Sequence, residues 1–235
     1  MHTRRTIGLL LLGIVLIGST MAVAIVATLV DAFGRRTAFA MVIGSLAVLM
    51  AAYVFVIGPW HRRWGATPEE VAAPLPGDDL LPPGAASTTR AITIAAPPGQ
   101  VFPWLVQIGF GKAGWYSYDL IDNDGEPSAD EIHPEWQDLT PGDRIVMMPP
   151  DFGPIVRAVE RDDHIVSAGD ADSWCLQLRP SLGGGTRLIS RWRQAWPKGP
   201  ATALWTAIAD PGAFIMERKM LRTLKRRAES TRLTW

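Results

Sequence analysis

The sequence predicts an α+β fold in which a curved antiparallel sheet packs on a long C-terminal helix, preceded by two apolar helices. Three observations support this prediction. Two runs near the N-terminus, Thr6–Val30 and Thr37–Trp60, contain no charged side chain. Short β-like runs separated by turn residues fill the middle of the chain. Apolar residues recur at helical spacing between Ala213 and Glu229.

Each uncharged run is long enough to cross a bilayer as a helix, which satisfies its own backbone hydrogen bonds in the hydrocarbon. We therefore expect a transmembrane hairpin in residues 1–60, with spans at about 6–30 and 37–60. A cleaved signal peptide and a buried core helix are the alternatives. The apolar region of a signal peptide is only about 7–15 residues long, so a membrane anchor is the better interpretation.

Arginines near the ends of the spans set the expected orientation. One pair precedes the first span, one pair follows the second, and one pair lies in the connecting turn: Arg4 and Arg5, Arg62 and Arg63, and Arg35 and Arg36. Cytoplasmic flanks carry the excess of Lys and Arg, so both ends of the hairpin are expected in the cytoplasm. This predicts a multi-pass protein of the plasma (inner) membrane with a cytoplasmic soluble domain.

Charge and cysteine content exclude several classes of function. The chain has 23 basic and 23 acidic residues, so no overall positive field favours nucleic acid. Its single cysteine, Cys175, excludes an internal disulfide and a thiolate zinc cluster. We interpret Cys175 as a small buried strand residue rather than a nucleophile. We expect no metal and no cofactor.

Residues 61–88 are rich in proline and poor in large apolar side chains, which is typical of an extended linker outside the core. The soluble domain is then expected at residues 89–235. A half-buried strand is predicted at Thr89–Ala96, and the prolines after it open a helix over Gln100–Ile108.

Further strands are expected in the second half of the domain, because short runs of β-forming residues alternate with turn residues. Their close spacing favours antiparallel hairpins. The expected strands are Arg144–Met148, Ile155–Val159, His164–Ala168, Trp174–Arg179 and Thr186–Ala195. The terminal helix would lie across the concave face of this sheet. Its cations, from Arg218 to Arg227, are expected on a wet face or against anionic lipid.

Five segments carry a resemblance to a known superfamily: Thr89–Gly109, Gly111–Asp119, Ile132–Asp143, Gly185–Arg193 and Phe214–Glu229. Together they resemble a bacterial subgroup of the SRPBCC superfamily, which contains START, Bet v 1 and polyketide cyclase-like domains. The resemblance implies a helix-grip fold, with a seven-stranded antiparallel sheet around the C-terminal helix and a hydrophobic cavity between them. It implies no single reaction, since the superfamily includes lipid carriers, hormone binders and cyclases.

Three aromatic residues and an acid follow the first helix: Trp115, Tyr116, Tyr118 and Asp119. A tyrosine offers a flat apolar body and one hydroxyl, which suits the orientation of a mostly apolar ligand. In the resembling subgroup this is a hallmark segment, so we expect it to line the cavity. Support of the fold by packed aromatic rings is the alternative.

His133 is the histidine with the most obvious functional neighbours in sequence, since Glu135 and Trp136 follow it. Its imidazole is a weak candidate for a general acid or base, as is the Asp119 carboxylate. A hydrogen-bonded structural role and contact with a ligand are the alternatives for His133. Trp136 is expected at the ligand.

Arg187, Arg191 and Arg193 share one parity with Ile189, so all four project from the same face of a strand. A solvated convex face accounts for them. In the opposite orientation Arg191 would reach the cavity and bind an anionic headgroup. Two residues of the terminal helix complete the expected binding residues: Glu217 as a possible internal partner, and Met220 on the apolar stripe.

Three functions are compatible with these patterns. The leading hypothesis is a membrane-anchored module that binds a lipid-like or isoprenoid-like small molecule in a helix-grip cavity. The second is an enzyme of the cyclase or dehydratase kind that acts on an apolar substrate. The third is a structural or interaction domain whose cavity is filled by its own side chains. The expected partners are a hydrophobic small molecule and the lipid bilayer.

Overall fold

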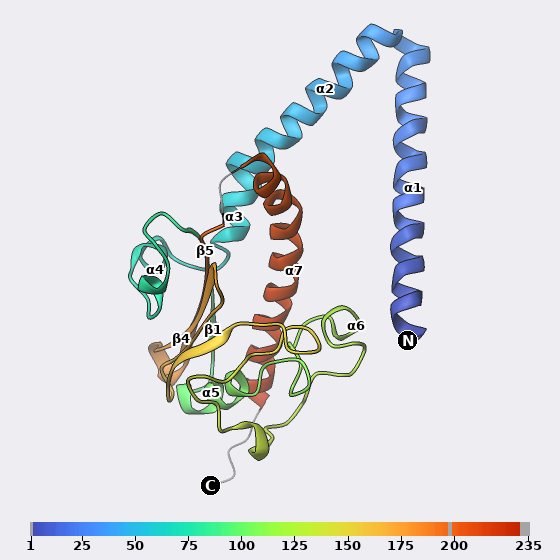
Figure 1. Cartoon of the computed structure of the whole chain (residues 1–235). Helices are drawn as coiled ribbons and strands as arrows, with labels where there is room; N and C mark the ends of the chain where they lie inside the picture. Colours follow the sequence, from blue (N-terminus) through green and yellow to red (C-terminus); the bar gives the residue numbers. More distant parts are fainter. Residues whose placement is uncertain (1, 197–198, 231–235) are drawn as a thin grey trace. The chain divides into compact units, whose positions relative to one another are not determined.

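The computed structural model describes residues 2–196 and 199–230. The chain separates into two compact units, of which the first ends at Trp60 and the second begins at His61. The first unit is helical and apolar. The second contains the sheet and the long C-terminal helix (Figure 1).

The first unit is built from α1 (His2–Phe33) and α2 (Arg35–Ala52). Gly34 separates them with a φ of 76°, a conformation that glycine adopts without steric cost. A π-helical turn, η1 (Tyr53–Ile57), and α3 (Gly58–Arg62) continue from α2. The stretches Leu16–Phe33 and Arg35–Arg62 are, by length and composition, long and apolar enough to cross a membrane.

The second unit contains one five-stranded sheet in the order β1-β5-β4-β3-β2, with every neighbouring pair antiparallel. The predicted α+β fold with an antiparallel sheet is confirmed. The strands are β1 (Ala86–Ile94), β2 (Ile155–Glu160), β3 (His164–Ala168), β4 (Asp172–Pro180) and β5 (Thr186–Gln194). This strand order leaves β1 and β2 as the two edges of the sheet.

The seven strands implied by the resemblance are not all formed in the described residues. The strand predicted at Arg144–Met148 is replaced by an irregular hairpin, which has isolated bridges between Arg144 and Ile155 and between Met148 and Phe152. Pro149-Pro150 lies at the turn of this hairpin, where proline has no N–H that could extend the pairing.

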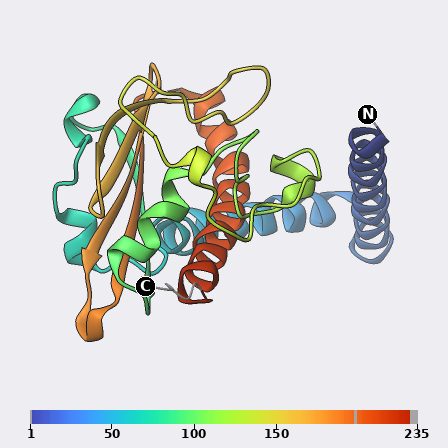
Figure 2. The same cartoon turned by 90° about the horizontal axis from the view of Figure 1, so that it is seen from below.

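Two helices cover one face of the sheet, α5 (Pro98–Val106) and α7 (Pro200–Ser230). Figure 2 shows both helices on one side of the strands and the segment that contains α4 (Pro68–Ala72) on the other. The remaining short elements are η2 (Asp78–Leu80), α6 (Asp119–Asp122), η3 (Pro134–Trp136) and η4 (Leu182–Gly184).

The main core lies between the sheet and these two helices. Fully buried side chains come from the strands, from α5 and from α7: Ile94, Leu178, Leu188, Val101, Leu105, Leu221 and Leu224. The side chains of this cluster therefore occupy much of the space in which the resemblance implied an apolar cavity. Burial of this apolar surface is the main stabilising contribution to the unit.

Residues 65–84, which we call the strap, pack on the opposite face of the sheet. They were predicted to form an extended linker, and that prediction is wrong. Leu75 and Leu81 are buried, and Leu75 joins a second apolar cluster with Cys175 and Ile189. The strap supplies the cover that an apolar sheet face needs, which its low content of large apolar residues did not reveal.

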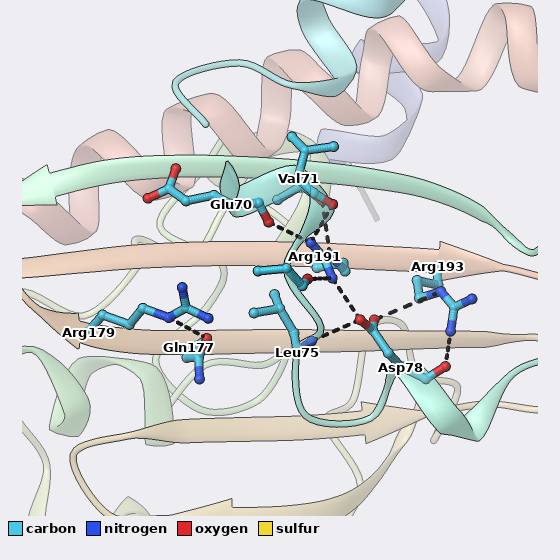
Figure 3. Close-up of polar contacts among 10 residues, drawn as sticks. Glu70, Val71, Leu75, Asp78, Gln177, Arg179, Arg191 and Arg193 are labelled. Carbon is cyan, nitrogen blue, oxygen red and sulfur yellow. Dashed lines mark hydrogen bonds and ion pairs between the residues drawn. The ribbon is translucent and has the colours of Figure 1, made fainter. Parts of the chain in front are cut away.

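Arg191 makes five hydrogen bonds, four of which hold the strap to β5. Its Nε donates to the Thr89 hydroxyl, and its two terminal nitrogens donate to the Asp78 carboxylate and to backbone carbonyls of the strap at 2.7–3.0 Å (Figure 3). The side chain of Arg191 is only 5% exposed. A buried guanidinium is tolerated when all its donors are matched in this way.

The neighbouring arginines of β5 bind the same segment. Arg187 pairs with both oxygens of Glu70 at 2.7 and 2.8 Å, and Arg193 donates to the Asp78 carbonyl. The shared face predicted for these arginines is confirmed, but its predicted exposure to solvent is wrong. Carboxylates and carbonyls of the strap replace water as their partners, so the ligand contact predicted for Arg191 is also wrong.

The hydrogen bonds between Arg191 and the strap predict a large loss of stability on Arg191→Met. The substitution removes the closest cation from Asp78 and leaves several strap carbonyls without their donor. Breaking such a buried pair costs about 3–5 kcal/mol. Guanidinium unfolding of the full chain in dodecyl maltoside, followed by tryptophan fluorescence, measures this loss. Arg179→Met is the control, since Arg179 lies on the same face and, among residues 2–196 and 199–230, hydrogen-bonds only Gln177; it should cost less than about 1 kcal/mol. Equal losses of stability in the two variants would contradict the role of Arg191 in holding the strap.

Candidate functional site

An open groove of about 780 Å³ lies between β1 and α7, entirely within the second unit. One wall is the edge of β1 from Ala91 to Thr93, with Trp64 and Gly65 beside it. The other wall is α7 between Phe214 and Arg226. A volume of this size matches that of small-molecule sites.

The groove exists because β1 is an edge strand whose outer side is only partly paired. The Ala91 N–H donates to the Trp64 carbonyl at 3.1 Å, and Lys225 Nζ donates to the Thr93 carbonyl at 2.7 Å. Gly65 has a φ of 73°, and a Cβ there would lie 2.1 Å from the Ala91 oxygen. Only glycine lets the chain run this close to β1, so Trp64 is fixed at the groove wall.

Aromatic side chains form the apolar part of the groove. Trp64 and Phe214 meet edge to face with ring centroids 6.2 Å apart, a favourable geometry for two aromatic rings. Tyr118 lies at the groove from the start of α6, and Ile92 and Ile215 add aliphatic surface. This wall can take the apolar body of a ligand.

Cations of α7 form the polar part. The guanidinium carbons of Arg218 and Arg222 lie 5.3 and 5.7 Å from the Trp64 ring, and Lys219 Nζ lies 4.0 Å from the Tyr118 ring. These are cation–π distances. Among the described residues that line the groove, none is Asp or Glu. The groove therefore offers an aromatic surface beside an unbalanced positive one.

A buried ion pair lies close to the groove, between Arg90 of β1 and Glu217 of α7. Arg90 Nε also donates to the His61 carbonyl at 3.0 Å, and its guanidinium carbon lies 5.4 Å from the Phe214 ring. The register of β1 places Arg90 on the face toward α7, whereas the arginines of β5 point to the strap. Glu217 is thus an internal partner, as the sequence suggested, but of Arg90. Its carboxylate pairs with Arg90, and its predicted contact with a ligand stays a prediction.

The aromatic segment after α5 serves mainly to pack the fold. Tyr116 is 1% exposed, meets Trp104 edge to face at 5.9 Å, and accepts a hydrogen bond from Gln107 at 2.8 Å. Burial raises the pKa of its phenol, so it stays protonated. Trp115 packs against Trp174 with ring centroids 6.2 Å apart.

His133 and Trp136 stack on each other with ring centroids 4.2 Å apart. The His133 N–H donates to Gln107 Oε1 at 3.0 Å, and its Nδ1 lies 3.3 Å from Glu135. The same Gln107 that bonds Tyr116 therefore anchors this loop. These contacts correspond to the structural alternative considered for His133.

The remaining predicted residues separate in space. The Asp119 carboxylate accepts a hydrogen bond from the Ser128 hydroxyl. Met220 is buried in the core rather than exposed to a cavity. Tyr118 is the one predicted binding residue among those lining the groove. In the described residues, no hydrogen bond or ion pair joins His133 to Asp119.

Sequence reasoning missed the two aromatic residues that matter most to the groove. Trp64 was assigned to a membrane-proximal linker, and Phe214 was counted only as part of the apolar side of the terminal helix. The cations of that helix were expected on a wet face. Their spacing carried a signal, since Arg218 and Arg222 are four residues apart and lie on one face.

No protein-family model matches the sequence, and no curated protein matches it. Similar solved structures include a polyketide-cyclase-like protein from Corynebacterium glutamicum at 17% identity and a TM-score of 0.35, covering 63% of this chain and 91% of that one. A conserved protein of unknown function from Enterococcus faecalis matches at 13% identity and a TM-score of 0.38, covering 64% and 75%. A Chromobacterium violaceum protein matches at 13% identity and a TM-score of 0.40, covering 62% and 99%.

The position of Cys175 predicts an unreactive thiol in the native protein. Burial under the strap, with the nearby Asp78 charge, raises its pKa to about 12. The reactive thiolate is then about one part in ten thousand at pH 8. Ellman's reagent should leave the native chain unmodified and react fully in concentrated guanidinium chloride. Rapid reaction of the native chain would show that the strap opens readily.

Proposed function

We propose that this chain is a membrane-anchored binding module that holds a lipid-like amphiphile in the groove between β1 and α7. The observation that carries this proposal is the groove itself, which sets an aromatic surface beside a row of cations. Such a site suits a molecule with an apolar body and a polar or charged head. The resemblance to SRPBCC domains supports a binding role as well.

The apolar helices support the membrane part of the proposal. Trp64, the first residue of the groove wall, follows Trp60 by only four positions in the sequence. Anchoring of α1 and α2 in a bilayer would keep the binding domain close to a source of lipid. The exposed apolar side chains along α1, α2 and η1, such as Ile17, Val48 and Phe55, are those that a hydrocarbon environment would cover.

The enzyme alternative has less support. His133 and Asp119 make contacts that fix loops, and neither is among the described residues lining the groove. An apolar groove with cations and no carboxylate offers binding more readily than proton transfer.

The binding proposal is tested by native mass spectrometry of the full chain in dodecyl maltoside after incubation with a bacterial lipid extract. Wild type should retain an amphiphile of defined mass. Trp64→Ala should lower its occupancy several-fold, because the indole forms the groove wall.

Trp136→Ala is the matched control, since it removes an indole that stacks on His133 outside the groove. It should retain wild-type occupancy. An empty wild-type chain, or equal losses in the two variants, would count against the groove as the binding site.

Membrane anchoring predicts that the full chain stays in the membrane pellet after washing with alkaline carbonate. Replacing Leu46 and Val48 of α2 by arginine should release a large fraction into the supernatant. Each arginine near the centre of a span costs about 2.5–3.5 kcal/mol of insertion free energy. Arg161→Glu, a charge change on the surface of the second unit, is the control. Release of the wild-type chain by carbonate would contradict anchoring.

A further inference from the structure

We infer that the basic wall of the groove is a phosphate site centred on Arg222, and that the ligand of the groove is a phosphate-bearing amphiphile. This inference rests on the proposed function and specifies the chemistry of the ligand. It concerns the polar end of the groove, whereas Trp64 and Phe214 define the apolar end.

Arg222 has a cation at each of its four neighbouring positions on the surface of α7. Residues three and four positions away along a helix lie next to each other. For Arg222 these positions hold Arg218, Lys219, Lys225 and Arg226. Like charges at such spacing destabilise a helix by about 0.2–0.5 kcal/mol per pair. The arrangement is unfavourable in the empty groove and favourable once an anion binds.

The chain itself neutralises only part of this charge. Lys225 pairs with Glu229 at 3.0 Å, and Arg187 at the opposite wall pairs with Glu70. Within the described ranges, no carboxylate lies within 4.0 Å of Arg218, Lys219 or Arg222. The charge of these three groups is available to a ligand.

Arg218 adds a second, independent observation. Its Nε is buried and has no hydrogen-bond partner among the described residues. A buried donor without a partner costs about 1–3 kcal/mol, more when it is charged. Arg218 and Arg222 both lie over the Trp64 ring, which restricts their motion and leaves the N–H groups in the guanidinium planes free to donate. The two groups are thus held in place with donors unused.

Phosphate fits this arrangement better than a carboxylate does. A phosphate monoester carries about −1.5 to −2 charges and three acceptor oxygens, so it can serve several cations at once. Guanidinium groups bind its oxygens in pairs. The aromatic wall beside the cations accommodates an acyl or prenyl chain attached to the phosphate. A phospholipid and a soluble phosphate ester share this headgroup chemistry.

The test uses the full chain in dodecyl maltoside, a detergent without phosphorus, and isothermal titration calorimetry with three probes. Dihexanoyl phosphatidic acid carries both tails and phosphate, dihexanoylglycerol carries the tails alone, and glycerol 3-phosphate carries the phosphate alone. Wild type should bind dihexanoyl phosphatidic acid most tightly, with a phosphorus NMR signal that broadens on binding.

Arg222→Gln should weaken binding of dihexanoyl phosphatidic acid by about tenfold or more, since it removes a charge-assisted hydrogen-bonding group. Its affinity for dihexanoylglycerol should be unchanged. Arg222→Lys should restore part of the loss, because it returns the charge without the planar fork. Arg161→Gln, an exposed arginine outside the groove, should leave all affinities at wild-type values.

The outcomes separate this inference from the proposed function. Equal binding of dihexanoyl phosphatidic acid and dihexanoylglycerol, unaffected by Arg222→Gln, would overturn the phosphate site and leave the amphiphile groove standing. Binding of glycerol 3-phosphate as tight as that of dihexanoyl phosphatidic acid would keep the phosphate site and overturn the amphiphile. Failure of all three probes to bind would overturn both.

Discussion

The row of guanidinium groups on the outer face of β5 is the interaction on which the arrangement of the second unit depends. Arg191 and Arg193 bind the strap through Asp78, and Arg187 binds it through Glu70 and the Gly65 carbonyl. These contacts let a segment with few large apolar side chains cover a whole sheet face. They also hold Trp64 beside β1. Without the strap, Trp64 would not be fixed in the groove wall and Cys175 would lose its cover.

The cationic side chains on the two faces of the sheet have different partners. On the strap side, each arginine of β5 meets a carboxylate of the same chain. On the α7 side, Arg90 meets Glu217, but the outer cations of α7 near Arg222 meet aromatic rings instead. A net charge of zero over the whole sequence therefore conceals a local excess at the groove. The function that we propose follows from this local imbalance, which composition alone does not reveal.

The sequence predicted the periodic elements well, because their signals are local. Alternation placed β2, β3 and β5 within one residue of their ends and β1 within three, and apolar spacing found the terminal helix. The strap was missed because its burial depends on pairing with arginines more than 100 residues away in sequence. The structural contacts of the predicted site residues were missed for a related reason. Tyr116 and His133 look like ligand contacts in sequence, yet both bond Gln107, a residue whose role is visible only once the loop folds back on α5.

The close contact of Gly65 with β1 also limits how many residues can lie between Trp60 and Gly65. The Trp64 carbonyl is held by Ala91, and the next residue has no room for a side chain. An insertion or deletion between Trp60 and Gly65 would place a different residue against Arg218 and Arg222. Homologues that share this groove should therefore keep both the number of these positions and the glycine at position 65.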